Sequence, residues 1–247
     1  MNTISISSAD LANTTTAFAT LLSGLTALAL CRWAGPQPRR WTVVYAAVVV
    51  TAIPTIWYHG FGETPVAGFF DGATNLLLAW VWQVAALGDY YRPRTRRIVS
   101  GGSAAVLLGV SIWRLAAGLE QTRSMAVQFG DFGGFSVNEL VLIVSAFLVL
   151  GLMYAKVSHV PARARPLLYL LTALFLVGWL LATASNQQVD GRIFAWHALW
   201  HVVGAFGFVV LWAYNQARCL SVSSAQPAEQ FDQHALRRRA DRHGNHH

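Results

Sequence analysis

Two histidines near the end of the chain, His197 and His201, are four residues apart in the apolar stretch HALWH. On a helix with 3.6 residues per turn, this spacing puts both imidazoles on one face, where they can share a metal ion. His59, at the end of an earlier apolar segment, offers a third imidazole. Three neutral histidines are a ligand set of catalytic zinc, which keeps its fourth position open for water. We therefore expect these three histidines to form a zinc site.

Two further polar residues lie near His59 in the sequence. Asp71 follows it by twelve residues across a glycine-rich turn, and Thr55 precedes it by four, on the same helix face. A carboxylate beside zinc can hold the attacking water and accept its proton as general base. We expect Asp71 to have this role. Thr55 could donate to a substrate carbonyl or the oxyanion, or only satisfy a backbone carbonyl at a proline kink, and both interpretations stay open. Asn75 and Tyr58 are candidate supporting partners.

The elements that position these residues are apolar blocks. The 247 residues are 55% hydrophobic and only 12% charged, about half the roughly 25% charge of a soluble domain. Blocks of about 19 to 23 apolar residues are long enough to cross a hydrocarbon core of about 30 Å. The sequence predicts an all-α integral membrane domain at residues 1–220, a seven-transmembrane helix bundle. Its candidate spans are 11–30, 41–59, 69–87, 98–117, 137–155, 167–184 and 193–214.

The basic residues predict the orientation of this bundle. Fifteen of the 18 lysines and arginines lie in alternate loops and the tail, and three lie on the other side. Because basic residues are retained in the cytoplasm, the N-terminus is expected outside and the C-terminus in the cytoplasm. The four site residues at 59, 71, 197 and 201 then lie at similar depth, near the outer leaflet. The net charge of +7 thus reflects topology, and we expect no nucleic-acid partner.

Some polar residues at span ends are better interpreted as structural than as part of the site. Arg114 and Glu139 lie at outer ends, where they could pair or reach the interface, and His159 lies at an inner end. A lone histidine in a span also commonly holds helices together, but three histidines and an aspartate at one depth favour a metal. Residues 221–247 are polar and basic and are expected to be a disordered cytoplasmic tail. Cys31 and Cys219 are not expected to form a disulfide.

The ordered set of Thr55-x-x-x-His59, then Asp71, then His197-x-x-x-His201 in seven spans resembles the CREST superfamily of membrane hydrolases. That superfamily includes alkaline ceramidases, progestin and adiponectin receptor proteins with the haemolysin III group, and Per1 lipid-remodelling proteins. The resemblance covers residues 11 to 215 and implies the same zinc ligands, with Asp71 acting on water. Thr55 stands where the family pattern has serine. Only Asp10 precedes the first span, so the calcium site of the ceramidases is not expected.

The leading prediction is a zinc-dependent intramembrane hydrolase that cleaves an amide bond of a ceramide-like N-acyl lipid. A lipid ester hydrolase of the Per1 type and a lipid-sensing seven-span receptor are the alternatives. Bis-histidine haem ligation is disfavoured because two histidines one turn apart on one helix cannot bracket a haem. A retinal protein needs a Schiff-base lysine in the last helix, whereas the only lysine is Lys156.

Overall fold

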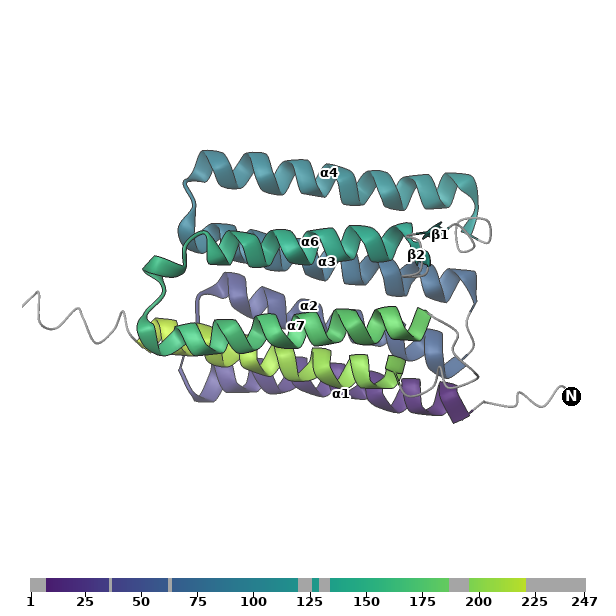
Figure 1. Ribbon diagram of the computed structural model, residues 1–247, viewed down its shortest axis with the longest axis horizontal. Helices are drawn as coiled ribbons and strands as arrows, with labels where there is room; N and C mark the ends of the chain where they lie inside the picture. Colours follow the sequence, from purple (N-terminus) through teal and green to yellow (C-terminus); the bar gives the residue numbers. More distant parts are fainter. Residues whose placement is uncertain are drawn as a thin grey trace, which may run out of the picture.

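The computed structural model describes residues 8–35, 37–61, 64–119, 126–128, 134–186 and 196–220. Within these residues, seven long helices run side by side along one axis (Figure 1). The first six are α1 (Ser8–Trp33), α2 (Arg39–Phe61), α3 (Pro65–Tyr90), α4 (Pro93–Ala117), α6 (Val137–Tyr154) and α7 (Arg165–Asn186). The seventh, drawn yellow-green in Figure 1, is the C-terminal helix Trp196–Leu220.

Each of the seven expected segments is helical over its described residues, apart from Ala155 at the end of the fifth. The helices extend past most of the expected limits, because their first and last turns carry polar residues that a count of apolar blocks leaves out. Among the residues that the structure describes, five segments are long and apolar enough to cross a membrane: Leu11–Trp33, Arg39–Phe61, Pro93–Ala117, Ala162–Ala182 and Trp196–Leu220. The apolar part of α6 is shorter, Leu140–Tyr154. The protein is thus a helical bundle suited to multiple membrane crossings, while seven crossings and the orientation remain predictions.

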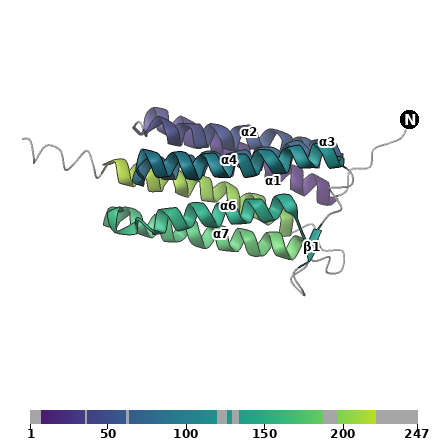
Figure 2. The same ribbon diagram turned by 90° about the horizontal axis from the view of Figure 1, so that it is seen from above.

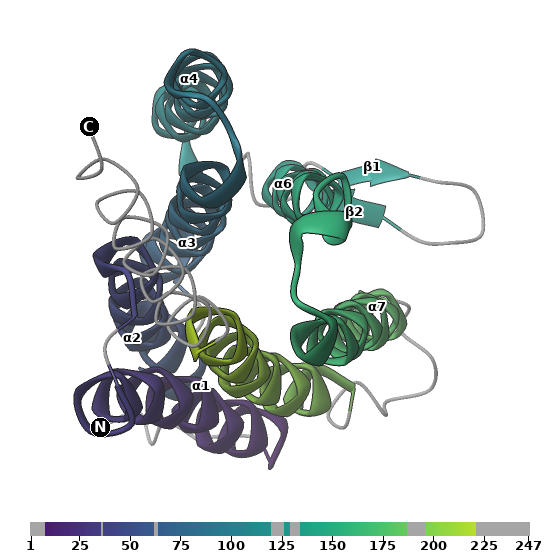
Figure 3. The same cartoon turned by 90° about the vertical axis from the view of Figure 1, so that its left-hand side faces the viewer.

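The helices are arranged around a common interior. Seen end on, α1, α2, α3, α6, α7 and the C-terminal helix surround it, and α4 lies outside, beside α3 (Figure 3). Figure 2 shows the same arrangement of helices from above. In α4 the one buried residue is Arg114, and large apolar side chains such as Ile98, Leu108 and Leu115 are exposed, as in a helix in contact with lipid. The site is therefore built by the other helices.

The start of α3 is fixed by local capping. The Thr64 side chain accepts a hydrogen bond from the Ala67 backbone N–H, and Pro65 occupies the first turn. A threonine cap satisfies an otherwise unpaired donor, and proline is preset for the first helical position. The helix therefore begins at Pro65, six residues after His59, which places Asp71 in its second turn.

One short element departs from the all-α expectation. Ala126–Gln128 (β1) and Gly134–Ser136 (β2) pair antiparallel, with Ala126 opposite Ser136. Three-residue strands carry too little pattern to be distinguished in a sequence from loop. They lie between α4 and α6, next to the start of α6 (Figure 3).

Several of the largest fully buried side chains of the core lie toward the bundle end where α2 begins and α3 ends. They include Trp41, Tyr45, Leu87 and Tyr214. Cys31 and Cys219 nearby are free thiols. The expected tail at 221–247 lies outside the described residues.

Candidate metal centre

The three histidines converge at the opposite end of the bundle, where α2 ends and the C-terminal helix begins. The Nε2 atoms of His59 and His197 are 3.2 Å apart. The ring centroid of His201 lies 4.8 Å from that of His197 and 5.4 Å from that of His59. One ligand nitrogen from each residue lies within 4.8 Å of the others. The structure thus brings together side chains 138 residues apart into a cluster that could hold a metal ion.

One edge of the cluster has the length expected in a zinc site. In a tetrahedral site with Zn–N bonds of about 2.0–2.1 Å, two ligand nitrogens lie roughly 3.3 Å apart. The 3.2 Å separation between the Nε2 atoms of His59 and His197 matches that edge. His59 is buried, at 6% exposed, whereas His197 and His201 are half-buried. Neutral imidazoles are also ligands that suit zinc, copper, iron and nickel, so the chemistry of the donors indicates a transition metal and does not by itself select zinc.

The tautomer of His201 is set by α1. Its Nδ1 lies 3.2 Å from the backbone carbonyl oxygen of Asn13 and 3.3 Å from the Thr16 hydroxyl oxygen. A carbonyl oxygen can only accept, so Nδ1 carries the proton and donates it. The Thr16 hydroxyl donates to the Ala12 carbonyl, which leaves its oxygen free to accept as well. His201 therefore presents the lone pair of Nε2 to the cluster, as metal-binding histidines held by a second hydrogen bond do.

The contribution of α1 was not anticipated from the sequence. The contact is made by a backbone carbonyl, which every residue has, so no residue type in the sequence points to it. The only hint that α1 approaches the site is the run of polar residues at 13–16. The end of α2 lies close to α1 at Gly60, because a Cβ atom there would lie 3.1 Å from Thr14 Cγ2. A larger residue at this position would require the Thr14 side chain to shift by a few tenths of an ångström. Tyr58 packs its ring beside that of His59, with centroids 5.0 Å apart.

Asp71 lines the same cavity as the histidines and is held by two side chains. The Thr55 hydroxyl lies 2.5 Å from its Oδ1, and the Asn75 amide donates to the same oxygen at 3.3 Å. Thr55 is also 3.0 Å from the Thr51 carbonyl oxygen, yet it has one proton and the carboxylate is nearer. We assign that proton to Asp71. In this arrangement Thr55 orients the carboxylate.

A cavity of about 250 Å³ extends from this cluster into the bundle. Its polar end is formed by the histidines, Asp71, Thr55 and Asn75, and the rest is lined mainly by apolar and small side chains of α3, α6, α7 and the C-terminal helix. On α3 the lining runs from Asp71 to Trp82, eleven residues further on, which is roughly 16 Å at 1.5 Å per residue. The cavity therefore has a polar end at the histidines and a long apolar part that extends into the bundle.

Of the other polar residues considered at span ends, neither Arg114 nor His159 lines this cavity. The Arg114 guanidinium lies over the Phe69 ring, 5.4 Å from its centroid. The side chain of Glu139 lies outside the described residues, so its pairing with Arg114 stays untested. His159 ends the short 3-10 helix Val157–His159, at the opposite end of the bundle, where its Nδ1 lies 3.3 Å from the Ser158 hydroxyl.

Comparison with protein-family models and with curated proteins finds no match for this chain. The case for its function therefore depends on the geometry of the cluster and the cavity.

Proposed function

We propose that this protein is a zinc-dependent hydrolase that cleaves an acyl lipid within the membrane, at the amide bond of a ceramide-like N-acyl lipid. The observation that carries the proposal is the juxtaposition of three imidazoles and a carboxylate at the polar end of an otherwise apolar cavity. The proposal also agrees with the resemblance to the CREST hydrolases.

Each residue has a distinct task in this proposal. His59, His197 and His201 would hold the ion, which would supply Lewis acidity for the carbonyl and lower the pKa of a bound water. Asp71 holds the attacking water and accepts its proton, which it can return to the leaving amine. The hydrogen bonds from Thr55 and Asn75 keep the carboxylate oriented toward that water.

The apolar body of the cavity supports a substrate with a long hydrocarbon chain. Side chains such as Leu78, Ile143 and Phe175 line it, and burying a methylene group contributes about 0.8 kcal/mol. With the carbonyl beside the histidines, the acyl chain would extend between α3, α6 and α7. We further propose that α3 and α6 also cross the membrane, with the N-terminus outside, which would place the cluster near the outer leaflet.

The choice of an amide over an ester rests on the resemblance to alkaline ceramidases. The residues at the site would serve either bond, so the Per1-like ester hydrolase is the alternative. A receptor that binds a lipid without rapid turnover would use the same cavity. These alternatives are separated by turnover of matched amide and ester substrates.

The test uses the purified full chain, with metal content and lipid hydrolysis measured on the same preparations. We expect about one zinc ion per chain, the complement of a single three-histidine site, and turnover of N-acyl sphingosine. The double change His197→Ala and His201→Ala should remove both. The matched control is His159→Ala, at the opposite end of the bundle, which should change neither. Full zinc content in the double variant would refute the site, and zinc binding without turnover of amide or ester would favour the receptor.

A further inference from the structure

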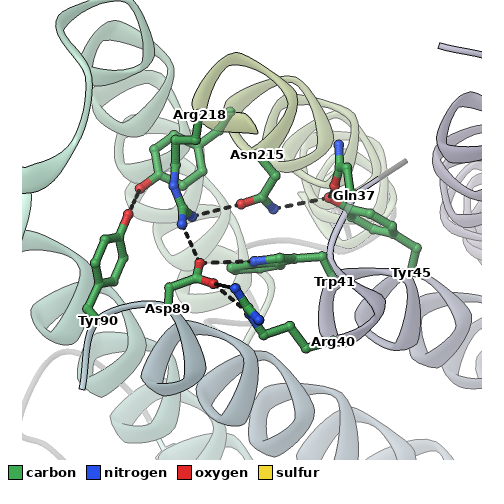
Figure 4. Close-up of polar contacts among 9 residues, drawn as sticks. Gln37, Arg40, Trp41, Tyr45, Asp89, Tyr90, Asn215 and Arg218 are labelled. Atoms are coloured by element: carbon green, nitrogen blue, oxygen red, sulfur yellow. Dashed lines mark hydrogen bonds and ion pairs between the residues drawn. The ribbon is translucent and has the colours of Figure 1, made fainter. Parts of the chain in front are cut away.

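A second polar cluster lies at the end of the bundle opposite the histidines, centred on Asp89 near the end of α3 (Figure 4). The Asp89 side chain is 1% exposed. Its Oδ1 accepts from the Arg40 guanidinium, with Nε at 2.6 Å. Its Oδ2 accepts from the Trp41 indole N–H at 3.0 Å and from Arg218 Nη2 at 2.5 Å. One buried carboxylate thus binds side chains from α2 and from the C-terminal helix. We call Arg40, Trp41, Asp89 and Arg218 the Asp89 clasp.

The Arg218 side chain is held on several sides. Its guanidinium lies 4.8 Å from the ring centroid of Tyr90 and 5.1 Å from that of Tyr214. Its Nη1 donates to the Asn215 side-chain oxygen at 3.0 Å. The Tyr90 and Tyr214 hydroxyl groups are 3.2 Å apart. A planar guanidinium in such contacts has a defined position, so the C-terminal helix is fixed against α3 at this end.

The network continues to the connection between α1 and α2. Asn215 donates to the Tyr45 hydroxyl at 3.1 Å, and that hydroxyl donates to the Gln37 side-chain oxygen at 2.9 Å. Gln37 in turn donates to the Trp212 carbonyl at 3.0 Å. Figure 4 shows the chain of contacts from Asp89 through Arg218 and Asn215 to Tyr45. Buried groups linked in this way are satisfied in one arrangement of the helices.

The clasp lies on the same helices as the site, at nearly equal distances. Asp71 and Asp89 on α3 are 18 residues apart, and so are His59 and Trp41 on α2. His201 and Arg218 on the C-terminal helix are 17 residues apart. At 1.5 Å per residue these separations are all roughly 26 Å. Because a helix is stiff along its axis, fixing its axial position at the clasp also fixes the axial position of its site residue.

We propose that the Asp89 clasp is a positioning device, which sets the axial position of the C-terminal helix against α2 and α3 and thereby aligns His197 and His201 with His59 and Asp71. Apolar side chains between helices can pack at several axial offsets, whereas a buried ion pair is satisfied only at one. Buried ion pairs contribute little net stability compared with apolar residues, and the fixing of register is their best-attested use. The effect of the clasp on metal binding rests on the proposed function. Its effect on the axial position of the C-terminal helix does not.

The experiment measures the helix positions directly, by pulsed electron paramagnetic resonance in lipid nanodiscs. Spin labels are attached at Phe70→Cys on α3 and Val202→Cys on the C-terminal helix, both exposed, at 47% and 44%. The native Cys31 and Cys219 are changed to serine. Arg218→Gln breaks the clasp. The matched control is Arg163→Gln, whose Nε donates to the Ala217 carbonyl at the same bundle end.

We expect Arg218→Gln to shift or broaden the distance distribution at the histidine end, and Arg163→Gln to leave it unchanged. Trp41→Phe removes only one donor to Asp89 and should give the same change at smaller size, which keeps the test decisive if Arg218→Gln folds poorly. Titration with Zn²⁺ should show roughly tenfold weaker binding in Arg218→Gln, a size typical of coupling through a packed element.

Two results have separate meanings. Unchanged distance distributions in folded Arg218→Gln and Trp41→Phe would overturn the positioning role, whatever the zinc affinity. Wild-type protein that binds no Zn²⁺ would refute the proposed function, while altered distances in the clasp variants would still support axial placement by the clasp.

Discussion

Replacing Thr55 with valine keeps the shape of the side chain but removes the hydroxyl that donates to Asp71. That hydroxyl is 2.5 Å from Asp71 Oδ1, and the remaining donor, the Asn75 amide, is 3.3 Å from the same oxygen. The carboxylate would therefore lose its shorter hydrogen bond and keep a longer one. The Thr51 carbonyl also loses a contact at 3.0 Å, but as a helical carbonyl it still has its backbone partner.

The size of the effect follows from the charge of the acceptor. A hydrogen bond to an ionised group contributes about 1.5–3 kcal/mol net, and each 1.36 kcal/mol is a factor of about ten in rate. If Asp71 must be oriented toward the water in the transition state, kcat should fall roughly 10- to 100-fold. Zinc content should not change, because Thr55 is not among the nitrogen donors.

The assay compares hydrolysis of N-acyl sphingosine and zinc content for three variants in nanodiscs. Thr55→Ser keeps the hydroxyl and should retain nearly full activity. Thr74→Val is the matched control, because the Thr74 hydroxyl donates only to the backbone carbonyls of Phe70 and Asp71 on its own helix. Full activity in Thr55→Val, or an equal loss in Thr74→Val, would show that this hydrogen bond does not orient the carboxylate.

The remaining predictions concern the base, the cavity and the orientation. Asp71→Asn should keep zinc but lower hydrolysis by roughly 10²-fold or more, the usual scale for a lost general base, and loss of the metal would make Asp71 a ligand. A Cβ at Gly204 would meet nothing within 4 Å in the cavity wall, so Gly204→Leu should fill that space and reduce kcat/KM for long acyl chains roughly tenfold more than for short ones. The control Gly101→Leu, on α4 outside the cavity, should leave this preference unchanged. A reporter fused after Leu220 should be active only on the cytoplasmic side, and activity outside would reverse the proposed topology.

Helix positions could be predicted because apolar blocks and proline-containing turns repeat clearly along the chain. The expected spans ended a few residues too early where the helix continues into polar residues beyond the apolar block. Asp89 shows the consequence, since the expected third span ended at residue 87 and left it in a loop. In the structure it belongs to α3 and is buried. A hydropathy count treats a charged residue as a boundary and cannot foresee that a partner on another helix permits its burial.

The histidines of the site could be predicted for a different reason. Their spacing and equal depth are readable once the direction of each helix is known, and the structure does bring them together. The supporting contacts could not be derived in this way. Asn13 acts through its backbone carbonyl, and the side chains of Arg40 and Arg218 look like topology signals when only their sign is counted. Pairing depends on which helices are neighbours, and that information is absent from a linear pattern.

The geometry of the cluster also favours a single metal ion over a haem group. Axial haem ligands lie on opposite faces of a porphyrin, with the ring between them. The Nε2 atoms of His59 and His197 are instead 3.2 Å apart, and His201 lies one helical turn from His197 on the same helix, with its ring 4.8 Å away. Its Nδ1 is occupied by the Asn13 carbonyl, which directs the other nitrogen toward the same point. Three donors converging on one small volume suit a single ion, and the apolar cavity beside them suits a lipid chain whose carbonyl would reach that ion.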